Sequence, residues 1–215
     1  MPTARPVAQA APLPGVRLTR RALLALPLLA ASAAAALPPG LRFRVVREGS
    51  PIGTHRVGFA ESDGLLTART EVDIAVRLLG VTVFRFSHRF EEAWAGDRLV
   101  GASSRLDRNG HVTEMRATAA EDAILVQGSA GRFRLPAAAA PLSWWDSRRL
   151  AGPLFANDTG KPVELRWSHS ALPGGGMLWR ATGEEESEGS YAADGSWIGR
   201  KTRAEDGSTV LYERA

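Results

Sequence analysis

The sequence predicts a mainly β protein, in which an antiparallel meander forms a curved sheet, a half-barrel or a barrel. From residue 41 onward, apolar and polar residues alternate with a period of two, as expected of strands that bury one face and expose the other. Asp-Gly and Asn-Gly dipeptides separate these runs, and they favour the positive φ angles of tight hairpin turns. The segments between the runs are too short for the helical crossovers that parallel strands require.

The alternating runs and the turn dipeptides follow one another along the chain. Apolar residues that share a strand face are Leu41, Phe43 and Val45; Val72, Ile74, Val76 and Leu78; Phe84, Phe86 and Phe90; and Val163, Leu165 and Trp167. The turn dipeptides are Asp63-Gly64, Asn109-Gly110, Asp194-Gly195 and Asp206-Gly207, and we expect type I′ turns at these positions. We therefore expect a meander in which neighbouring strands pair with each other.

One segment, residues 143–151, departs from the alternating pattern and predicts a short helix of about two turns. Ser143 is a typical N-cap residue, and the Gly-Pro pair after residue 151 would end the helix. Adjacent helical side chains point about 100° apart, so Trp144 and Trp145 cannot both bury on one narrow stripe. We expect one of the two rings to be exposed or to cover the mouth of a cavity.

The N-terminal segment, residues 1–36, has the features of a secretory signal peptide. The pair Arg20 and Arg21 precedes a short apolar stretch that ends in small residues. This pair favours export by the twin-arginine (Tat) route, and the alternative is an ordinary Sec signal. The apolar stretch is shorter than the roughly 20 residues of a membrane-spanning helix, so no permanent span is expected. We expect cleavage near Ala36, one β-rich domain over residues 37–215, and a location in the periplasm or outside the cell.

The charge balance argues against a nucleic-acid partner. The chain has a formal net charge of +4, with 27 basic and 23 acidic residues. Residues 1–36 contain four arginines and no acidic residue, and removing these four from the 27 basic residues leaves 23, equal to the acidic count. A domain with no net charge has no overall field that gathers polyanions, so no nucleic acid is expected.

The sequence contains no recognised catalytic motif and no cysteine. Hydrolase elbows, zinc-protease motifs, phosphate-binding loops and dinucleotide fingerprints are all missing from it. The lack of cysteine excludes disulfides, thiolate nucleophiles and Cys-ligated zinc or iron–sulfur sites. The four histidines are not spaced to form a local metal clamp. We therefore expect no catalytic residue, no metal and no cofactor, and we favour a binding protein over an enzyme.

Two groups of residues are candidates for binding a ligand or a partner. His88 shares a strand face with Phe86, where it could line a ligand cavity; the alternative is a hydrogen-bonded histidine at the margin of the core. Trp144 and Trp145, followed by Arg148, could form a cation–π platform for a sugar, a lipid head group or a partner. The alternative is a helix that buries one tryptophan and leaves the arginine in solvent.

Short motifs with a common resemblance are distributed over the chain after the leader. They are Phe43-Arg44-Val45, Gly49-Ser50-Pro51-Ile52-Gly53-Thr54-His55-Arg56, Pro141-Leu142-Ser143-Trp144-Trp145-Asp146, Asp158-Thr159-Gly160, Tyr191 with Asp194-Gly195-Ser196-Trp197, and Leu211-Tyr212. Together they resemble a family of exported proteins known only as the domain of unknown function DUF6134, although Asp146 stands where that family more often has Asn. The resemblance implies no known activity and no catalytic residues. By fold analogy, the expected architecture is similar to the half-barrels of periplasmic lipoprotein carriers.

Three functions are compatible with these observations. The leading hypothesis is a non-catalytic periplasmic binding or scaffolding protein whose concave β-surface holds an apolar or amphipathic envelope ligand, such as a lipid. One alternative is an unrecognised hydrolase acting on envelope material, with His55, His88 and Asp146 as candidate residues. The other is a structural partner of an envelope protein complex, which would use an open sheet edge or an exposed aromatic patch.

Overall fold

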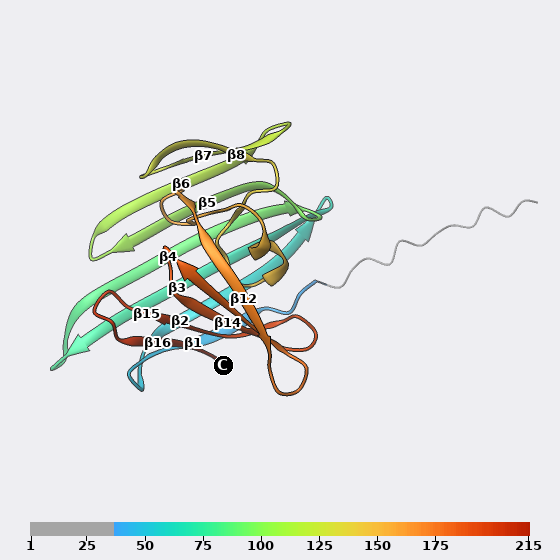
Figure 1. The fold of residues 1–215 in the computed structure, drawn as a ribbon. Coiled ribbons are helices and arrows are strands. Elements are labelled where there is room, and N and C mark those ends of the chain that lie inside the picture. Colours follow the sequence, from blue (N-terminus) through green and yellow to red (C-terminus); the bar gives the residue numbers. More distant parts are fainter. Residues whose placement is uncertain (1–36) are drawn as a thin grey trace, which may run out of the picture. The chain divides into compact units, whose positions relative to one another are not determined.

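Thirteen strands form one continuous antiparallel sheet (Figure 1). The computed structural model describes residues 37–215, and the expected signal peptide and its cleavage site lie outside the described residues. Along the sheet the strands run in the order β12-β13-β14-β15-β16-β1-β2-β3-β4-β5-β6-β7-β8. The meander expected from the alternating sequence is therefore confirmed.

The strands of the large sheet fall into two runs along the chain. The first run is β1 (Leu41–Arg47), β2 (Ser50–Ser62), β3 (Leu65–Leu78), β4 (Val81–Ala95), β5 (Arg98–Arg108), β6 (His111–Ala119), β7 (Ala123–Gly128) and β8 (Gly131–Pro136). The second run is β12 (Leu165–Ala171), β13 (Met177–Gly183), β14 (Ser187–Tyr191), β15 (Trp197–Arg203) and β16 (Thr209–Arg214). In both runs each strand pairs with the next one in the chain.

The two runs are joined where the last strand, β16, pairs with the first strand, β1. In this ladder Val45 lies opposite Tyr212. On β1 the alternation is plain, because Phe43 and Val45 are buried while Arg42 and Arg44 are exposed. Within the described residues the outer strands β8 and β12 do not pair with each other, so the sheet is open and no closed barrel forms.

Two of the four expected type I′ turns have the φ angles of that turn. Asp63-Gly64 and Asn109-Gly110 have positive φ at both residues, 53° and 73° in the first and 54° and 87° in the second. At Asp194-Gly195 and Asp206-Gly207 only the glycine has a positive φ, of 81° and 80°, so the prediction of type I′ turns was wrong there. In both places the backbone forms a longer loop, in which Asp194 or Asp206 caps the amide two residues on.

An insert, residues 137–164, connects the two runs of strands. It contains a three-stranded sheet of β9 (Ala140–Pro141), β10 (Leu154–Phe155) and β11 (Pro162–Val163), together with the 3-10 helix η1 (Ser147–Ala151). The insert packs on the inner face of the large sheet. Gly160, with φ of 75°, lies against the side chains of Val126 and Met115, and an added Cβ would come within 2.7 Å of Val126.

The helix within the insert is shorter than predicted and starts later. Its N-cap is Asp146, whose side chain accepts a hydrogen bond from the backbone amide of Arg148, and not Ser143. Trp144 and Trp145 therefore lie in a bend before the helix, and both are buried, at 6% and 8% exposure. Of the two alternatives expected for these rings, exposure of one ring is wrong, because a bend, unlike a helix, turns neighbouring side chains toward different parts of the core. The other alternative placed one ring at a cavity, and in the structure both rings line one.

The apolar core lies between the inner face of the sheet and the insert. Large side chains that are almost completely buried there include Phe43, Trp94, Tyr191, Trp197 and Phe155. They come from both runs of strands and from the insert, so the core holds all three together. Among the described residues, no helix is long and apolar enough to cross a membrane.

Candidate ligand-binding site

A cavity of about 200 Å³ lies between the inner face of the sheet and the insert. Its walls come from strands β2 to β5, from β15 and β16, and from two stretches of the insert around residues 142–145 and 157–158. About half of the side chains are aromatic or aliphatic, and the others are polar, with histidines and charged groups among them. The walls include His55, Phe86, His88, Trp144, Trp145, Trp197, Arg200 and Tyr212.

Four of the five residues predicted to bind a ligand line this cavity. Phe86 and His88 reach it from β4, and Trp144 and Trp145 reach it from the insert. Arg148 does not line it. Its side chain is 75% exposed, and its guanidinium binds the carboxylate of Asp146 over 2.8 Å. The structure therefore places Arg148, the cation of the predicted cation–π platform, outside the cavity that Trp144 and Trp145 line.

Trp144 fixes the insert to the second run of strands. Its backbone carbonyl accepts a hydrogen bond of 2.8 Å from the phenolic hydroxyl of Tyr191 on β14. Its ring lies against Gly189, where an added Cβ would come within 2.6 Å of the indole. The ring also makes an edge contact with Trp167, at 5.7 Å between centroids. Only a glycine at position 189 leaves room for the tryptophan.

Trp145 fixes the insert to the first run of strands. Its indole N–H donates a hydrogen bond of 2.9 Å to Glu92 on β4, and its ring makes an edge contact of 5.2 Å with Phe59 on β2. The guanidinium of Arg149 lies 5.1 Å from this ring and only 3.5 Å from the ring of Trp94. The two neighbouring tryptophans thus attach residues 142–145 of the insert, the lid of the cavity, to both runs of strands.

Glu92 is an ionisable residue with no exposed surface, and it lies next to Trp145 of the lid. The indole of Trp94 donates to one of its oxygens over 3.0 Å, and the indole of Trp145 donates to the other. Burial raises the pKa of Glu92 to about 7, and the hydrogen bonds from Trp145, Ser143 and Trp94 act in the opposite direction because they favour the carboxylate. Glu92 does not line the cavity, and its position indicates a structural role.

His88 is held in place by its neighbours on the cavity wall. Its Nε2 lies 2.8 Å from the hydroxyl of Ser104 on β5. Burial lowers the pKa of His88 to about 4, although the nearby charge of Asp158 and a hydrogen bond with the backbone of Asn157 act to raise it. The imidazole is therefore neutral at pH 7. Ser104 does not line the cavity, so the serine orients the histidine from behind.

His55 is the polar group of the cavity that has an unused hydrogen-bonding atom. It projects from β2 among the rings of Phe43, Trp197 and Tyr212, with centroid separations of 5.9, 5.2 and 5.5 Å. Within the described part of the chain, its buried Nδ1 has no hydrogen-bond partner. Burial, followed by the charge of Arg200 and the proximity of His88, lowers the pKa of His55 to about 3. The ring is therefore neutral, and its Nδ1 is a buried polar atom without a partner among residues 37–215.

The structure does not bring Asp146 to either histidine. Its carboxylate binds Arg148 and Arg149, the latter over 3.1 Å. Of the three residues proposed for a hydrolase, His55 and His88 share the cavity and Asp146 faces the arginines instead.

Sequence reasoning did not identify the wall that β15 and β16 contribute. Arg200 lies with its guanidinium 4.9 Å from the ring of Trp144, and it binds the carboxylate of Glu185 and the hydroxyl of Ser187. Tyr212 lines the cavity beside it. The only sequence signal for this wall was the resemblance of the motifs that contain Trp197 and Tyr212, which gave no role to either residue.

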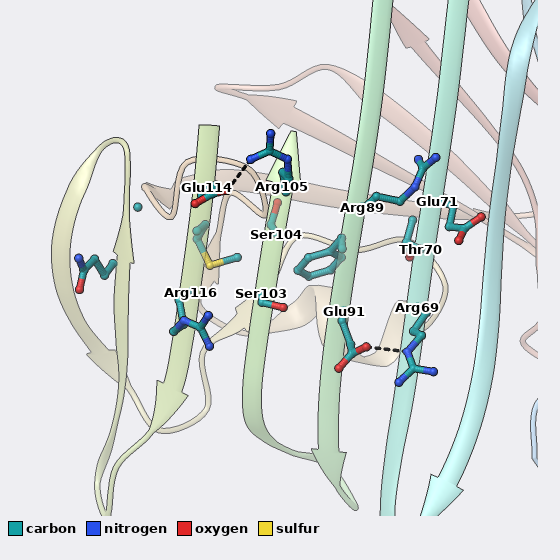
Figure 2. Close-up of a pocket in the computed structure, with 14 residues that line it drawn as sticks. Arg69, Thr70, Glu71, Arg89, Glu91, Ser103, Ser104, Arg105, Glu114 and Arg116 are labelled. Carbon is teal, nitrogen blue, oxygen red and sulfur yellow. Dashed lines mark hydrogen bonds and ion pairs between the residues drawn. The ribbon is translucent and has the colours of Figure 1, made fainter. Parts of the chain in front are cut away.

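A wider hollow of about 670 Å³ lies over the same strands, and most of its charged residues come from the opposite, exposed face of β3 to β6 (Figure 2). Figure 2 shows that its side chains pair across neighbouring strands, Arg69 with Glu91 and Arg105 with Glu114, each over 2.6 Å. These groups are exposed, and such pairs contribute about 0–1 kcal/mol each. Since opposite charges already neutralise one another here, this hollow is a weaker candidate for a ligand site than the cavity.

Comparison with known proteins places the chain in a family. The family model of a domain of unknown function, DUF6134, matches residues 43–215. The chain belongs to the DUF6134 family. The match covers every strand from β1 to β16 except the first two residues of β1, so the cavity and its lid lie entirely within the DUF6134 region.

A solved structure shares the fold of this DUF6134 chain. It is the crystal structure of a beta-barrel-like protein of domain of unknown function DUF1849 from Brucella abortus, with a TM-score of 0.54 and 9% sequence identity. The alignment covers 83% of this chain and 96% of the other. At this identity the likeness concerns the fold alone. A search of curated proteins found no match.

Proposed function

We propose that this DUF6134 chain is a non-catalytic binding protein for a small amphipathic molecule, and that it works in the periplasm or outside the cell after removal of its leader. The proposal rests on a cavity lined about equally by apolar side chains and by polar ones, among them His55, whose buried Nδ1 has no partner among the described residues. A buried polar atom without a partner costs about 1–3 kcal/mol, which a ligand would recover.

The size of the cavity limits the ligand. An engineered protein cavity of roughly 150 Å³ takes up benzene, and sites for drug-sized ligands start at roughly 300 Å³. A cavity of about 200 Å³ lies between these sizes. It suits a single ring, or a short alkyl group, that carries one polar group. A complete lipid would have to leave most of its chain outside, so we narrow the expected lipid-like ligand to a small molecule or the end of a larger one.

The chemistry of the walls defines where the polar group would lie. The rings of Trp144, Trp197 and Tyr212 offer an apolar surface, and His55 offers a neutral imidazole nitrogen. A hydroxyl or protonated acid can hydrogen bond to a neutral imidazole whichever nitrogen carries the proton. Arg200 lies on the same wall but is paired with Glu185, which also lines the cavity, so this pair adds no net charge and a neutral polar group is favoured. We therefore propose a phenol-like ligand, or a short-chain acid bound in its protonated form.

A binding role fits the cavity better than the hydrolase alternative does. To activate a serine, His88 would have to hydrogen bond to it, and its partner Ser104 lies behind the wall. Ser143 does line the cavity, but its hydroxyl is hydrogen-bonded to Glu92. A pKa of about 4 also makes His88 a weak base at neutral pH.

Thermal unfolding in the presence of small probes tests the proposal. Phenol and benzoate should raise the Tm of the purified protein in a concentration-dependent manner, because a ligand that binds only the folded state stabilises it. The variant His55→Phe fills the polar position with an apolar ring, so it should lose this response. His169→Phe is the matched control, since His169 is exposed on β12, and it should respond like the unmutated protein. The site would be excluded if His55→Phe and His169→Phe gave equal Tm shifts. It would also be excluded if neither phenol nor benzoate raised the Tm of the unmutated protein.

The proposed location is tested separately. The protein recovered from the periplasm or the medium should begin near Leu37 by N-terminal sequencing. A chain recovered from the cytosol with residues 1–36 intact would contradict export. It would not affect the proposed ligand binding, which the thermal unfolding experiment tests separately.

A further inference from the structure

The hairpin of β3 and β4 extends beyond both of its neighbouring strands, toward the lower left of Figure 1. The ladder with β2 ends at the pair Gly53–Ile74, and the ladder with β5 begins at the pair Phe86–Arg108. Residues 75–84 therefore form a two-stranded projection whose only ladder is the one between β3 and β4. Such a projection has no core of its own, so its composition need not serve packing.

The projection is apolar where exposed polar residues are expected. Four of its side chains are largely exposed, namely Leu78 at 63%, Leu79 at 97%, Val81 at 65% and Val83 at 55%. They are four of the nine exposed large hydrophobic side chains in the described residues. Scattered single apolar residues on a surface are ordinary, whereas a cluster at the tip of a projection indicates a contact surface.

The turn residue Leu79 adds a second, independent observation. Four hairpins of this sheet have a turn of the same kind, with a positive φ on the first residue and on the glycine that follows. Three use polar first residues, which are Glu48, Asp63 and Asn109, and the fourth uses Leu79 with φ of 50°. A left-handed conformation costs a bulky apolar residue roughly 1 kcal/mol and is better tolerated by Asn or Asp. Folding thus disfavours Leu79, and exposure gives it no packing in return.

The charges around the tip indicate what it contacts. The segment from Ile74 to Phe90 contains no acidic residue, and its arginines include Arg77 and Arg85, both exposed. Neither of these two forms an ion pair within the structure as described. An apolar tip with unpaired cations behind it is complementary to a membrane surface that has an apolar interior and anionic head groups.

We infer that the tip of the β3–β4 hairpin, residues 77–85, inserts into the interface of an anionic lipid bilayer. The spacing of the residues fits this geometry. Arg77 is two residues from Leu79, roughly 7 Å along the strand, and Arg85 lies opposite Ala75, roughly 13 Å from the tip. Interfacial segments bury their apolar side chains roughly 5–10 Å below the head groups. With Leu78, Leu79 and Val81 at that depth, Arg77 lies at the level of the lipid phosphates.

The insertion is shallow for a physical reason. The outer edges of residues 75–84 have backbone groups that no neighbouring strand satisfies, and such groups cannot enter the hydrocarbon core without a cost of several kcal/mol each. The hairpin therefore anchors the chain to one surface and does not span the bilayer. This anchoring operates whether or not the cavity holds a ligand.

Vesicle binding by the full chain tests the inference. The probes are vesicles of phosphatidylcholine alone and vesicles of equal parts phosphatidylcholine and phosphatidylglycerol, with bound protein measured by co-sedimentation. The double variant Leu78→Ser/Leu79→Asn should weaken binding to the anionic vesicles by on the order of tenfold per leucine. The double variant Arg77→Gln/Arg85→Gln should weaken it by about fivefold per arginine and reduce its dependence on salt. Leu125→Asn, at an exposed leucine on β7, is the matched control and should bind like the unmutated chain.

A loss of vesicle binding in the leucine double variant would not be explained by misfolding. Asn at position 79 relieves the strained turn, so the leucine variant should unfold at the same temperature as the unmutated chain, or higher. The full chain also carries the apolar leader, so the readout is the difference between each variant and the unmutated chain.

A fluorophore reports the depth directly. The chain has no cysteine, so Leu79→Cys and Leu125→Cys each provide a single site for the environment-sensitive dye NBD. Anionic vesicles should brighten and blue-shift the dye at position 79 and leave the dye at position 125 unchanged. Unchanged binding in the leucine variant, or a silent dye at position 79, overturns the inference and would leave a protein partner as the occupant of the tip.

Discussion

The indole N–H of Trp145 donates a hydrogen bond of 2.9 Å to Oε1 of Glu92, across 53 residues of sequence. This buried hydrogen bond joins the lid of the cavity to strand β4 of the sheet. Trp94 donates to the other carboxylate oxygen, so the carboxylate is held from two sides by indoles that belong to different parts of the chain. The position of the lid thus depends on a buried ionisable group.

Replacing Trp145 by Phe should destabilise the protein by about 1–3 kcal/mol, because one oxygen of the buried Glu92 loses its indole donor. Chemical denaturation at pH 7 measures the change in the free energy of unfolding. Trp179→Phe, at a half-buried position on β13 in the other run of strands, is the control and should change it less. Equal losses in the two variants would show that the hydrogen bond to Glu92 contributes little.

Removing the charge of Glu92 should change how stability depends on pH. The folded pKa of Glu92, about 7, lies above its ordinary value of 4.5, so the folded state holds the proton more tightly than the unfolded state does. The stability that this group contributes is fully present below pH 4.5 and is lost as the pH rises to about 7. The stability of the unmutated protein relative to Glu92→Gln should therefore fall by roughly 3 kcal/mol from pH 4.5 to pH 8. Parallel stability curves for the two proteins would contradict the raised pKa.

Below pH 6.5, the pH dependence of the protein's stability should be governed partly by His55. Its folded pKa, about 3, lies below its ordinary value of 6.5, so the unfolded state takes up a proton first as the pH falls. Stability is then lost progressively from pH 6.5 downward, by about 1.4 kcal/mol for each pH unit. The variant His55→Phe should lose correspondingly less stability between pH 6.5 and pH 4 than the unmutated protein. His111→Phe, at an exposed position, should follow the unmutated curve.

Gly189→Ala should be destabilising by about 1–3 kcal/mol, because its Cβ would come within 2.6 Å of the Trp144 ring and force the lid to move. Gly58→Ala is the matched control on β2. No atom lies within 4 Å of the Cβ that it would add, and alanine is favoured over glycine within a strand, so its stability should be unchanged or slightly higher. Urea denaturation of the two variants measures the difference. Similar stabilities would show that Trp144 has room to shift.

Local sequence patterns predicted the strands because the alternation of a strand is itself local. Phe86 and His88 were expected on one face since they are two residues apart, and both line the cavity. The same reasoning went wrong at Trp144 and Trp145, where a serine before an apolar pair favoured a helix. In the folded protein each tryptophan contacts a different run of strands, and these distant contacts decide the local backbone.

The partners of His55 could not be predicted for a related reason. The histidine meets Trp197 and Tyr212 because β16 pairs with β1, and this pairing brings together residues more than 140 positions apart. No periodicity in a sequence encodes which distant strands become neighbours. The exposed tip at Leu79 was missed because alternating apolar residues indicate burial only where a second layer covers the strand, and none covers this projection.

The pairing of the first strand with the last one also sets the order of assembly. β1 precedes β16 in the chain, so during synthesis one edge of β1 has no hydrogen-bond partner until β16 has been made. Losing the outer strand β8 would shorten the sheet at one edge, but losing the six-residue strand β16 would separate the four strands β12–β15 from the eight strands β1–β8. Local unfolding of β16 would therefore open the connection between the two runs of strands.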